Sequence, residues 1–235
     1  IAVNSATAGL HLALESLGIG AGDEIITTTL TFTATAAVAR HLGAEVRLVD
    51  IDERSLNIDA NKIEDAITSK TKAIVPVHYA GLSCEMDTIL EIAREHDLCV
   101  IEDAAQAIGS KYNGRFSGTF GTIGCFSAHP LKNLNAIGDC GYLTTNDKNL
   151  FISAKKMRNH GLQDRNVVKN FGFLSRMDVV QAAVLNFRVK KLKKIIASRR
   201  SNAKFYFDSL DRSKFKIINE KKYQFNTYHT FVIQT

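Results

Sequence analysis

The sequence predicts an α/β fold in which a mostly parallel central sheet carries helices on both faces. Two observations support this class. Helix-like and strand-like segments alternate from the first residues onward, which is the order that parallel strands with crossover helices require. The strand-like segments are also apolar at almost every position, as expected when both faces of a sheet are covered. A chain of 235 residues suffices for one large domain, or for one domain and part of a second.

Local residue patterns place the elements of the first half. Helices are predicted where apolar side chains recur every three or four residues, and the first two end before a glycine, which often ends a helix. Strands are predicted where short runs of apolar and β-branched residues lie between such helices. We therefore expect, in order, a strand at 1–3, a helix at 6–17, a strand at 24–28, a helix at 32–42, a strand at 46–49, a helix at 58–67, a strand at 73–77, a helix at 85–96 and a strand at 99–101.

The pattern changes in the second half. Residues 109–124 contain five glycines and show no helical period, which indicates loops. Two short strands are predicted at 124–127 and 141–144, with an irregular segment between them. A helix follows at 150–160, and one long helical pattern runs from 178 to 210.

The domain organisation follows from the absence of a linker. No stretch rich in proline, glycine or serine separates the two halves, so we expect them to pack as one unit. We predict a large domain over residues 1–198 and the beginning of a small α/β domain over 199–235. Because the chain begins and ends next to strand-like runs, at 1–3 and 230–233, we expect the natural polypeptide to be longer.

Charge is divided unevenly along the chain. Residues 1–150 carry a net charge of −8 and residues 151–235 a net charge of +14, which together give +6. A basic region of this kind can bind polyanions such as nucleic acid. Apolar residues recur every three to four positions among the lysines and arginines of 188–200, so the charges are expected to form the solvated face of a helix. Nucleic-acid binding is therefore the weaker hypothesis.

Composition excludes several classes of protein. A hydrophobic content of 45% and a charged content of 23% exclude wholesale disorder. No apolar run reaches the roughly 18–20 residues of a membrane span, and no secretory leader is recognisable. The four cysteines form no CxxC pair and have no histidine at metal-ligand spacing. We expect no disulfide framework, no metal site, no membrane contact and a cytoplasmic location.

Candidate functional residues lie where the predicted parallel strands end, because ligands of such sheets lie beyond those ends. Segment 4–9 joins the first strand to the first helix. Its free N–H groups and the hydroxyls of Ser5 and Thr7 can hold a phosphate, although a simple helix cap is the alternative. Asp103 follows the strand at 99–101, where a carboxylate can bind magnesium, cap a helix or pair with a protonated ring nitrogen.

A lysine and an aromatic residue complete the candidate set. Lys132 stands in an otherwise uncharged segment, and Pro130 restrains the backbone just before it. A desolvated lysine forms Schiff bases, whereas the alternative is an ordinary surface lysine. Phe32 either stacks on a ligand ring or packs in the core. A phosphate site, an acid and a lysine are together the three groups that pyridoxal phosphate requires.

These motifs, in this order, resemble the DegT/DnrJ/EryC1/StrS family of sugar aminotransferases, which are pyridoxal-phosphate enzymes of fold type I. The resemblance runs through almost the whole chain. The matching segments are 3–7, 22–24, 31–36, 77–81, 102–106, 126–132, 158–161 and 176–178.

The resemblance implies a role for each candidate residue. Lys132 would form a Schiff base with the cofactor and then act as general base, and Asp103 would pair with the pyridine nitrogen. The other cofactor-binding residues that it implies are Ala6, Thr7, Phe32, Gln106 and Ser127. An amino acid, usually L-glutamate, would aminate the cofactor, which would then aminate a nucleotide-linked keto sugar. The resemblance also implies a homodimer with its sites at the subunit interface.

Three departures from the family pattern leave an alternative open. Leu174 replaces an asparagine that usually reaches the phosphate of the neighbouring subunit's cofactor, and Cys140 stands where a second glycine is usual. We also expect the family's opening segment and most of its small C-terminal domain to be missing from this sequence. A catalytically impaired or non-catalytic scaffold of the same fold is therefore the main alternative. A dinucleotide oxidoreductase is disfavoured because no G-x-G-x-x-G follows a strand. The sequence does not identify the sugar, its carbon position or the nucleotide.

Overall fold

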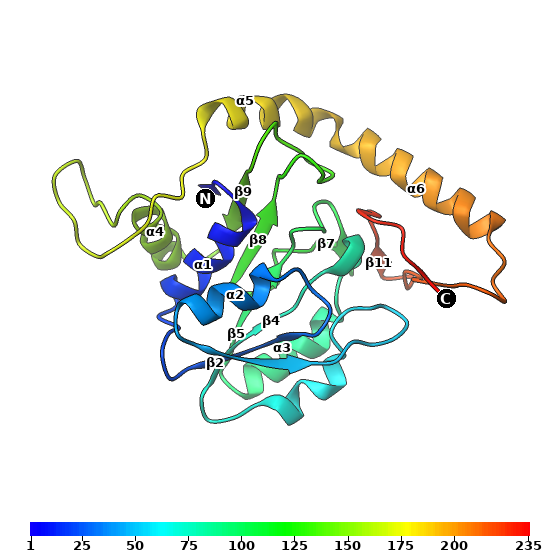
Figure 1. The fold of residues 1–235 in the computed structure, drawn as a ribbon, viewed down its shortest axis with the longest axis horizontal. Coiled ribbons are helices and arrows are strands. Elements are labelled where there is room, and N and C mark those ends of the chain that lie inside the picture. Colours follow the sequence, from blue (N-terminus) through cyan, green and yellow to red (C-terminus); the bar gives the residue numbers. More distant parts are fainter.

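A seven-stranded sheet forms the centre of the computed structural model, which describes residues 1–235 (Figure 1). The strands lie in the order β1-β9-β8-β5-β4-β2-β3. Their bounds are β1 Ala2–Val3, β2 Glu24–Thr28, β3 Glu45–Val49, β4 Thr71–Val75, β5 Cys99–Asp103, β8 Ile123–Ser127 and β9 Gly141–Thr144. Neighbouring strands from β3 to β8 pair in parallel, and β9 is antiparallel to both β8 and β1. The predicted mostly parallel sheet is confirmed.

Helices cover both faces of this sheet. Helices α1 (Ala6–Ser16), α2 (Ala34–His41) and α4 (Lys148–Met157) lie on one face, and α3 (Met86–Glu95) lies on the other (Figure 1). Successive side chains of a strand point to opposite faces. Ile25 of β2 therefore packs in the core beside α1, whereas Ile26 packs in the core beside α3. Because both faces are covered, the inner strands β2, β4, β5 and β8 are buried along almost their whole length, whereas the edge strand β3 is largely exposed.

Side-chain caps fix the starts of two helices. The Ser5 hydroxyl accepts a hydrogen bond from the Ala8 N–H at 3.1 Å, so α1 begins at Ala6. The Asp147 carboxylate accepts N–H groups of Asn149 and Leu150 at 2.7 and 3.0 Å at the start of α4. Such caps satisfy N–H groups that the helix itself leaves free.

The helix predicted at 58–67 is wrong. Two short 3₁₀ turns, Ala60–Lys62 and Glu64–Ala66, occupy this segment instead. The Asp59 carboxylate accepts the Asn61 N–H at 3.1 Å, which stabilises a turn. Asp, Asn and β-branched Ile are weak helix formers, so burial of two isoleucines produced an amphipathic pattern without a continuous helix.

The predicted loop at 109–124 contains a small hairpin. Strands β6 (Lys111–Tyr112) and β7 (Arg115–Phe116) pair with each other, and β6 also pairs with β11 (Gln224–Phe225). Asn113 and Gly114 form the turn, with φ of +48° and +79°. Asn-Gly is the strongest short hairpin signal, and here the strands on either side were too short to show alternation.

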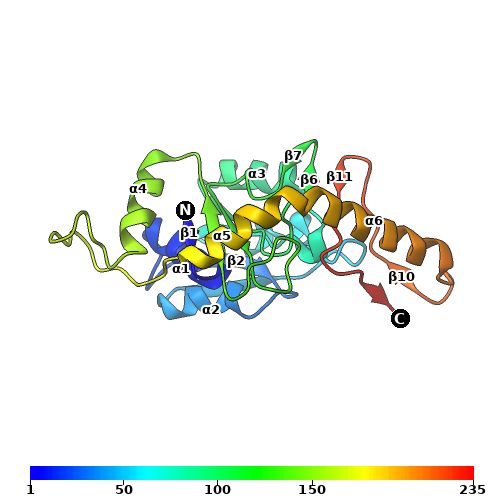
Figure 2. The ribbon, with the colours of Figure 1, turned by 90° about the horizontal axis from the view of Figure 1, so that it is seen from above.

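The long helical pattern at 178–210 forms a nearly continuous rod. Helix α5 (Val179–Arg188) joins α6 (Leu192–Ser209) through a 3₁₀ turn at Val189–Lys191. Figure 2 shows this rod crossing over the sheet domain, with a two-stranded sheet of β10 (Lys216–Ile217) and β12 (Ile233–Gln234) near its far end.

Burial along this rod follows the predicted apolar pattern only in part, because Val189, which shares that spacing, is 48% exposed. Leu185 and Ile196 are buried, whereas the basic side chains from Lys190 to Lys194 are exposed, as predicted for a solvated face. The domain boundary predicted after residue 198 falls inside α6, and the division into two domains stays a prediction. None of the helices combines the length and the apolar character needed to cross a bilayer.

Candidate active site

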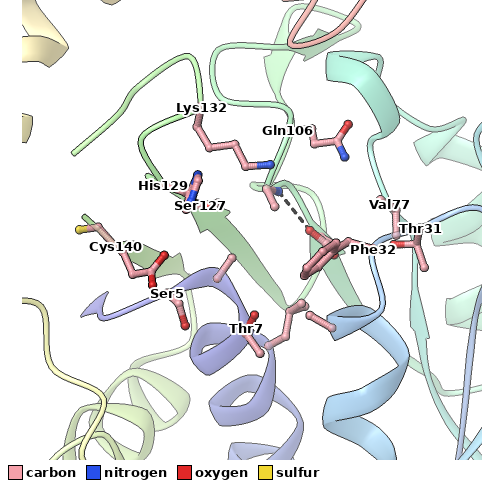
Figure 3. Close-up of a pocket in the computed structure, with 16 residues that line it drawn as sticks. Ser5, Thr7, Thr31, Phe32, Val77, Gln106, Ser127, His129, Lys132 and Cys140 are labelled. Atoms are coloured by element: carbon pink, nitrogen blue, oxygen red, sulfur yellow. Dashed lines mark hydrogen bonds between the residues drawn. The ribbon is translucent and has the colours of Figure 1, made fainter. Parts of the chain in front are cut away.

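One cavity of about 530 Å³ lies between the carboxyl ends of β5 and β8 and the beginning of α1 (Figure 3). All seven residues singled out from the sequence line it. They are Ala6, Thr7, Phe32, Asp103, Gln106, Ser127 and Lys132. The structure thus brings together side chains that are up to 126 positions apart in the sequence.

The beginning of α1 forms an anion-binding end of the cavity. Ser5 caps the helix, and the N–H groups of Ala6 and Thr7 belong to its first turn, where no intrahelical acceptor exists. These N–H groups and the positive end of the helix dipole favour a bound phosphate. Ser127, at the end of β8, adds a hydroxyl. Capping and anion binding were alternatives in the sequence, and the geometry is compatible with both.

Asp103 is a buried acid at the end of β5. The Thr35 hydroxyl donates to its Oδ2 at 2.8 Å, and the Ala105 N–H donates to its Oδ1 at 3.1 Å. Burial raises the pKa of Asp103, and the two hydrogen bonds and the nearby Lys132 oppose that rise only in part. A carboxylate in this setting is best stabilised by a cationic partner, such as a protonated ring nitrogen.

Lys132 extends into the cavity from the turn that follows β8. Figure 3 shows its amino group between Ser127 and Gln106, on the far side from α1. The main-chain N–H of Lys132 donates to the carbonyl of His129 at 2.8 Å, which stabilises the turn. Burial lowers the pKa of Lys132, and Asp103 opposes the effect. A larger fraction of this amine is therefore free to act as a nucleophile or base.

Phe32 and Gln106 flank the middle of the cavity. The Phe32 side chain is 73% exposed, which excludes the core-packing alternative and leaves its ring free to stack on a ligand. Gln106 Oε1 accepts the Ala80 N–H at 2.7 Å. Its amide nitrogen is therefore the free hydrogen-bonding group of this side chain.

Sequence reasoning did not assign a role to Thr35. Its hydroxyl lies 2.7 Å from that of Thr31 and donates to Asp103. No helical spacing in the sequence pairs the two threonines, because Thr31 precedes α2, which begins at Ala34. Of the two residues that depart from the family pattern, Cys140 is buried and lines this cavity, whereas Leu174 is 56% exposed and does not line it.

The structure shows neither a metal-binding cluster nor a disulfide. The structure contains no group of three or more histidine, cysteine, aspartate or glutamate side chains arranged to hold a metal ion. The four cysteines are free thiols, and three are buried.

With this sheet order, and with an amine, an acid and a helix N-terminus around one cavity, the chain has the architecture of the fold-type-I aminotransferases. The model of the DegT/DnrJ/EryC1/StrS aminotransferase family matches residues 1–235, and the chain belongs to this family. The resemblance inferred from the sequence motifs is confirmed.

Relatives and solved structures agree with this membership. A pleiotropic regulatory protein of Geobacillus stearothermophilus is 42% identical over 94% of this chain and 60% of its own length. A UDP-N-acetyl-3-dehydro-alpha-D-glucosamine 3-aminotransferase of Acidithiobacillus ferrooxidans is 41% identical over 98% of this chain and 62% of its own length. The crystal structure of DesV from S. venezuelae, in complex with a ketimine intermediate, matches with a TM-score of 0.97 at 35% identity, over 100% of this chain and 64% of DesV. The chain spans about three-fifths of the length of these proteins.

Proposed function

We propose that this chain is the cofactor-binding part of a pyridoxal-phosphate-dependent aminotransferase that converts a nucleotide-linked keto sugar to an amino sugar. The observation that carries the proposal is the placement of Lys132, Asp103 and the start of α1 around one cavity. Each matches one part of the cofactor: the aldehyde, the ring nitrogen and the phosphate. Family membership and the sugar aminotransferase among the relatives support the reaction class. The amino-group donor proposed is L-glutamate.

Pyridoxal phosphate, when bound, supplies an electron sink for negative charge that develops on the carbon bearing the amino group. The residues of this chain do the rest. Lys132, with its lowered pKa, would hold the cofactor at its aldehyde carbon and, once the incoming amine has displaced it, would accept and return the proton of the reacting carbon. Asp103 would keep a proton on the ring nitrogen, and Phe32 would cover one ring face and exclude water from it.

A spectroscopic half-reaction tests the proposal. Full-length protein mixed with pyridoxal phosphate should gain the visible absorbance of lysine-bound cofactor, and L-glutamate should then convert that band to the pyridoxamine form. Failure of both steps would contradict the proposal.

The second candidate function is a regulatory scaffold that keeps the fold without catalysis. The regulatory protein among the relatives favours it, and so does Leu174, which cannot donate a hydrogen bond. This candidate predicts that L-glutamate leaves the bound cofactor unchanged, so the same half-reaction separates the two functions.

The close packing behind the phosphate end gives a prediction at Gly141. An added Cβ at this position would lie 2.6 Å from the carbonyl carbon of Ser5 and 2.7 Å from the nitrogen of Ala6. We expect Gly141→Ala to displace the start of α1 and to weaken pyridoxal phosphate binding about tenfold, by the loss of roughly one hydrogen bond. Absorbance titration measures this affinity.

Gly20→Ala is the matched control, because the nearest atom to its added Cβ lies 3.5 Å away. Equal affinities for the two variants would contradict the assignment of the phosphate to the start of α1.

We infer further that the enzyme is a homodimer with its sites at the interface. Large apolar side chains on α5 and on the loop before it support this inference: Phe171 is 96% exposed, Val179 84% and Phe187 60%. The Gln181 side chain on α5 accepts the Ile137 N–H at 2.9 Å. Helix α5, which carries two of these apolar side chains, therefore adjoins the segment that carries the lysine.

Substitution of Val179 by glutamate tests the dimer. We expect Val179→Glu to convert the full-length protein to monomers, because a buried unpaired charge is costly. Light scattering after size-exclusion chromatography measures the mass. Phe205→Glu, at an exposed site on α6, is the control. A dimer that survives Val179→Glu but not Phe205→Glu would place the interface elsewhere.

A cytoplasmic location is also proposed. The four free thiols support a reducing compartment. Fractionation of cells that express the full-length protein tests the location, and recovery in an extracytoplasmic fraction would contradict it.

A further inference from the structure

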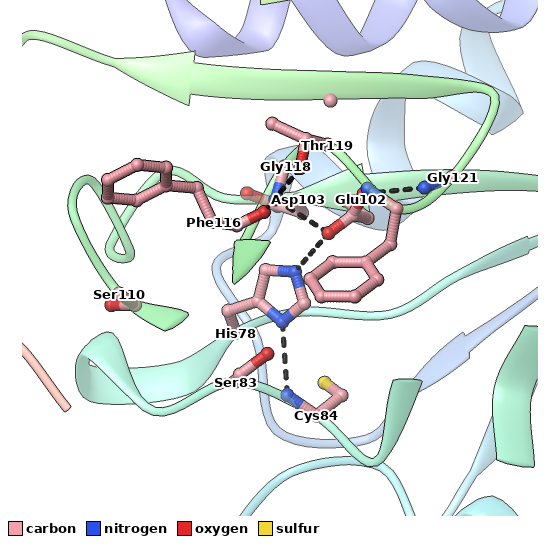
Figure 4. Close-up of polar contacts among 12 residues, drawn as sticks. His78, Ser83, Cys84, Glu102, Asp103, Ser110, Phe116, Gly118, Thr119 and Gly121 are labelled. Atoms are coloured by element: carbon pink, nitrogen blue, oxygen red, sulfur yellow. Dashed lines mark hydrogen bonds and ion pairs between the residues drawn. The ribbon is translucent and has the colours of Figure 1, made fainter. Parts of the chain in front are cut away.

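A buried carboxylate lies directly behind the proposed active site. Glu102 precedes Asp103 on β5, so its side chain points to the opposite face of the sheet, and it is 0% exposed. Four hydrogen bonds converge on it (Figure 4). The donors are the N–H groups of Gly118, Phe120 and Gly121, at 2.6, 2.6 and 2.7 Å, and Nε2 of His78, at 2.9 Å. Although burial raises the pKa of Glu102, these hydrogen bonds hold it below its ordinary value, so the group is ionised.

His78 connects this carboxylate to the loop after β4. Nδ1 of His78 accepts the Cys84 N–H at 3.1 Å, so this nitrogen must keep its lone pair. Against the lowering effect of burial, Cys84 and Glu102 raise the pKa of His78. The Cys84 N–H nevertheless occupies the Nδ1 lone pair, and this geometry assigns a single ring proton, on Nε2. His78 is 0% exposed, and its ring is therefore fixed from both sides.

The loop held in this way reaches two groups of the cavity. Within it, Ala80 has a φ of +55° and Gly81 a φ of +96°, a left-handed conformation that alanine adopts only when its surroundings impose it. The turn directs the Ala80 N–H to Oε1 of Gln106 at 2.7 Å. The N–H of His78 donates to the carbonyl of Asp103 at 3.1 Å.

We propose that Glu102 and His78 are positioning residues for the cofactor ring. Neither side chain lines the cavity. Glu102 and His78 hold the loop at 78–84, and the Ala80 N–H of this loop fixes the amide of Gln106. The main-chain N–H of His78 fixes the main chain of Asp103. The proposal rests on the proposed function, because the ring beside Gln106 and Asp103 is that of pyridoxal phosphate.

Two substitutions of His78 separate its two hydrogen bonds. His78→Asn keeps an acceptor near the position of Nδ1 for Cys84 but has no group that reaches Glu102. His78→Gln places an amide nitrogen near the position of Nε2 and so restores the donor to Glu102. Ser117→Ala is the control, because the Ser117 hydroxyl is buried in the adjoining loop and has no partner.

We expect His78→Asn and Glu102→Gln to weaken pyridoxal phosphate binding about tenfold, by roughly the loss of one hydrogen bond, and to shift the visible band of the bound cofactor. His78→Gln should restore both properties. In the cofactor-free protein, hydrogen exchange over residues 79–82 should be faster in His78→Asn than in the wild type and unchanged in Ser117→Ala. The exchange measurement does not depend on activity.

The proposal is overturned if His78→Asn and Glu102→Gln only lower the melting temperature and match Ser117→Ala in affinity, band position and exchange. It is also overturned if His78→Gln behaves like His78→Asn. Absence of the visible band in the wild type would instead contradict the proposed function. Exchange over 79–82 would then still test whether His78 holds the loop.

Discussion

Replacement of Lys132 by alanine is expected to remove the visible absorbance of lysine-bound cofactor and to slow amino transfer by about 10⁴-fold or more, since both the attachment group and the proton-transfer group are lost. The reason lies in its position. Its amine projects into the cavity opposite the start of α1, and burial there lowers its pKa. Single-turnover absorbance with L-glutamate measures the rate.

Lys132→Arg separates charge from amine chemistry. Arginine keeps the positive charge but stays protonated, so it neither attaches the cofactor nor accepts a proton. We expect it to be as inactive as Lys132→Ala, whereas Lys148→Ala, at an exposed site on α4, should behave like the wild type. Activity in Lys132→Arg would mean that this residue serves only as a cation.

Asp103→Asn is expected to lower the amino-transfer rate by about 10²–10³-fold, the usual effect of removing one preorganised electrostatic group. Asparagine keeps the size of the side chain and an acceptor for the Ala105 N–H, but it cannot hold a proton on the ring nitrogen. Single-turnover rates at saturating cofactor measure the loss. Asp139→Asn is the control, because Asp139 lines the same cavity but is exposed. Similar rates for the two variants would contradict the role of Asp103.

Although Asp103→Asn should slow amino transfer, we expect it to stabilise the cofactor-free protein at neutral pH. Because burial raises the pKa of Asp103, the folded chain binds this proton more tightly than the unfolded chain does. This proton therefore stabilises the folded chain fully when the pH is below 3.8, the ordinary pKa of aspartate. The stabilisation is lost as the pH rises through the folded-state pKa of Asp103. At neutral pH, Asp103→Asn should therefore raise the free energy of unfolding, and at acid pH the gain should disappear. Denaturant titration at both pH values measures this.

Much of this site was predictable because each of its main groups has a local signature. Asp103 follows an apolar strand, Lys132 stands in an uncharged segment after another strand, and the start of α1 carries capping residues. Parallel strands end at one edge of a sheet, so these separate signals converge there. The alternatives at Phe32 needed the structure, since a phenylalanine has the same sequence signature in a core and on a cavity wall.

The network behind the site was not predictable in the same way. His78 and Glu102 are 24 positions apart and meet only because β4 and β5 are neighbours in the sheet. The donors from Gly118 to Gly121 are main-chain groups, and their direction depends on backbone angles that side-chain identity does not reveal. For a similar reason the 3₁₀ turns at 58–67 were mistaken for a helix: their buried isoleucines follow helical spacing, and only the main-chain path distinguishes the two.

The most direct test of the central claim is to locate the bound cofactor covalently. Borohydride reduction of the full-length protein with pyridoxal phosphate, followed by proteolysis and mass spectrometry, identifies the amine that holds the aldehyde. We predict one modified peptide, with the added mass on Lys132 and none in Lys132→Ala. Modification of a different lysine, or an unmodified Lys132 in protein that retains the cofactor, would contradict it.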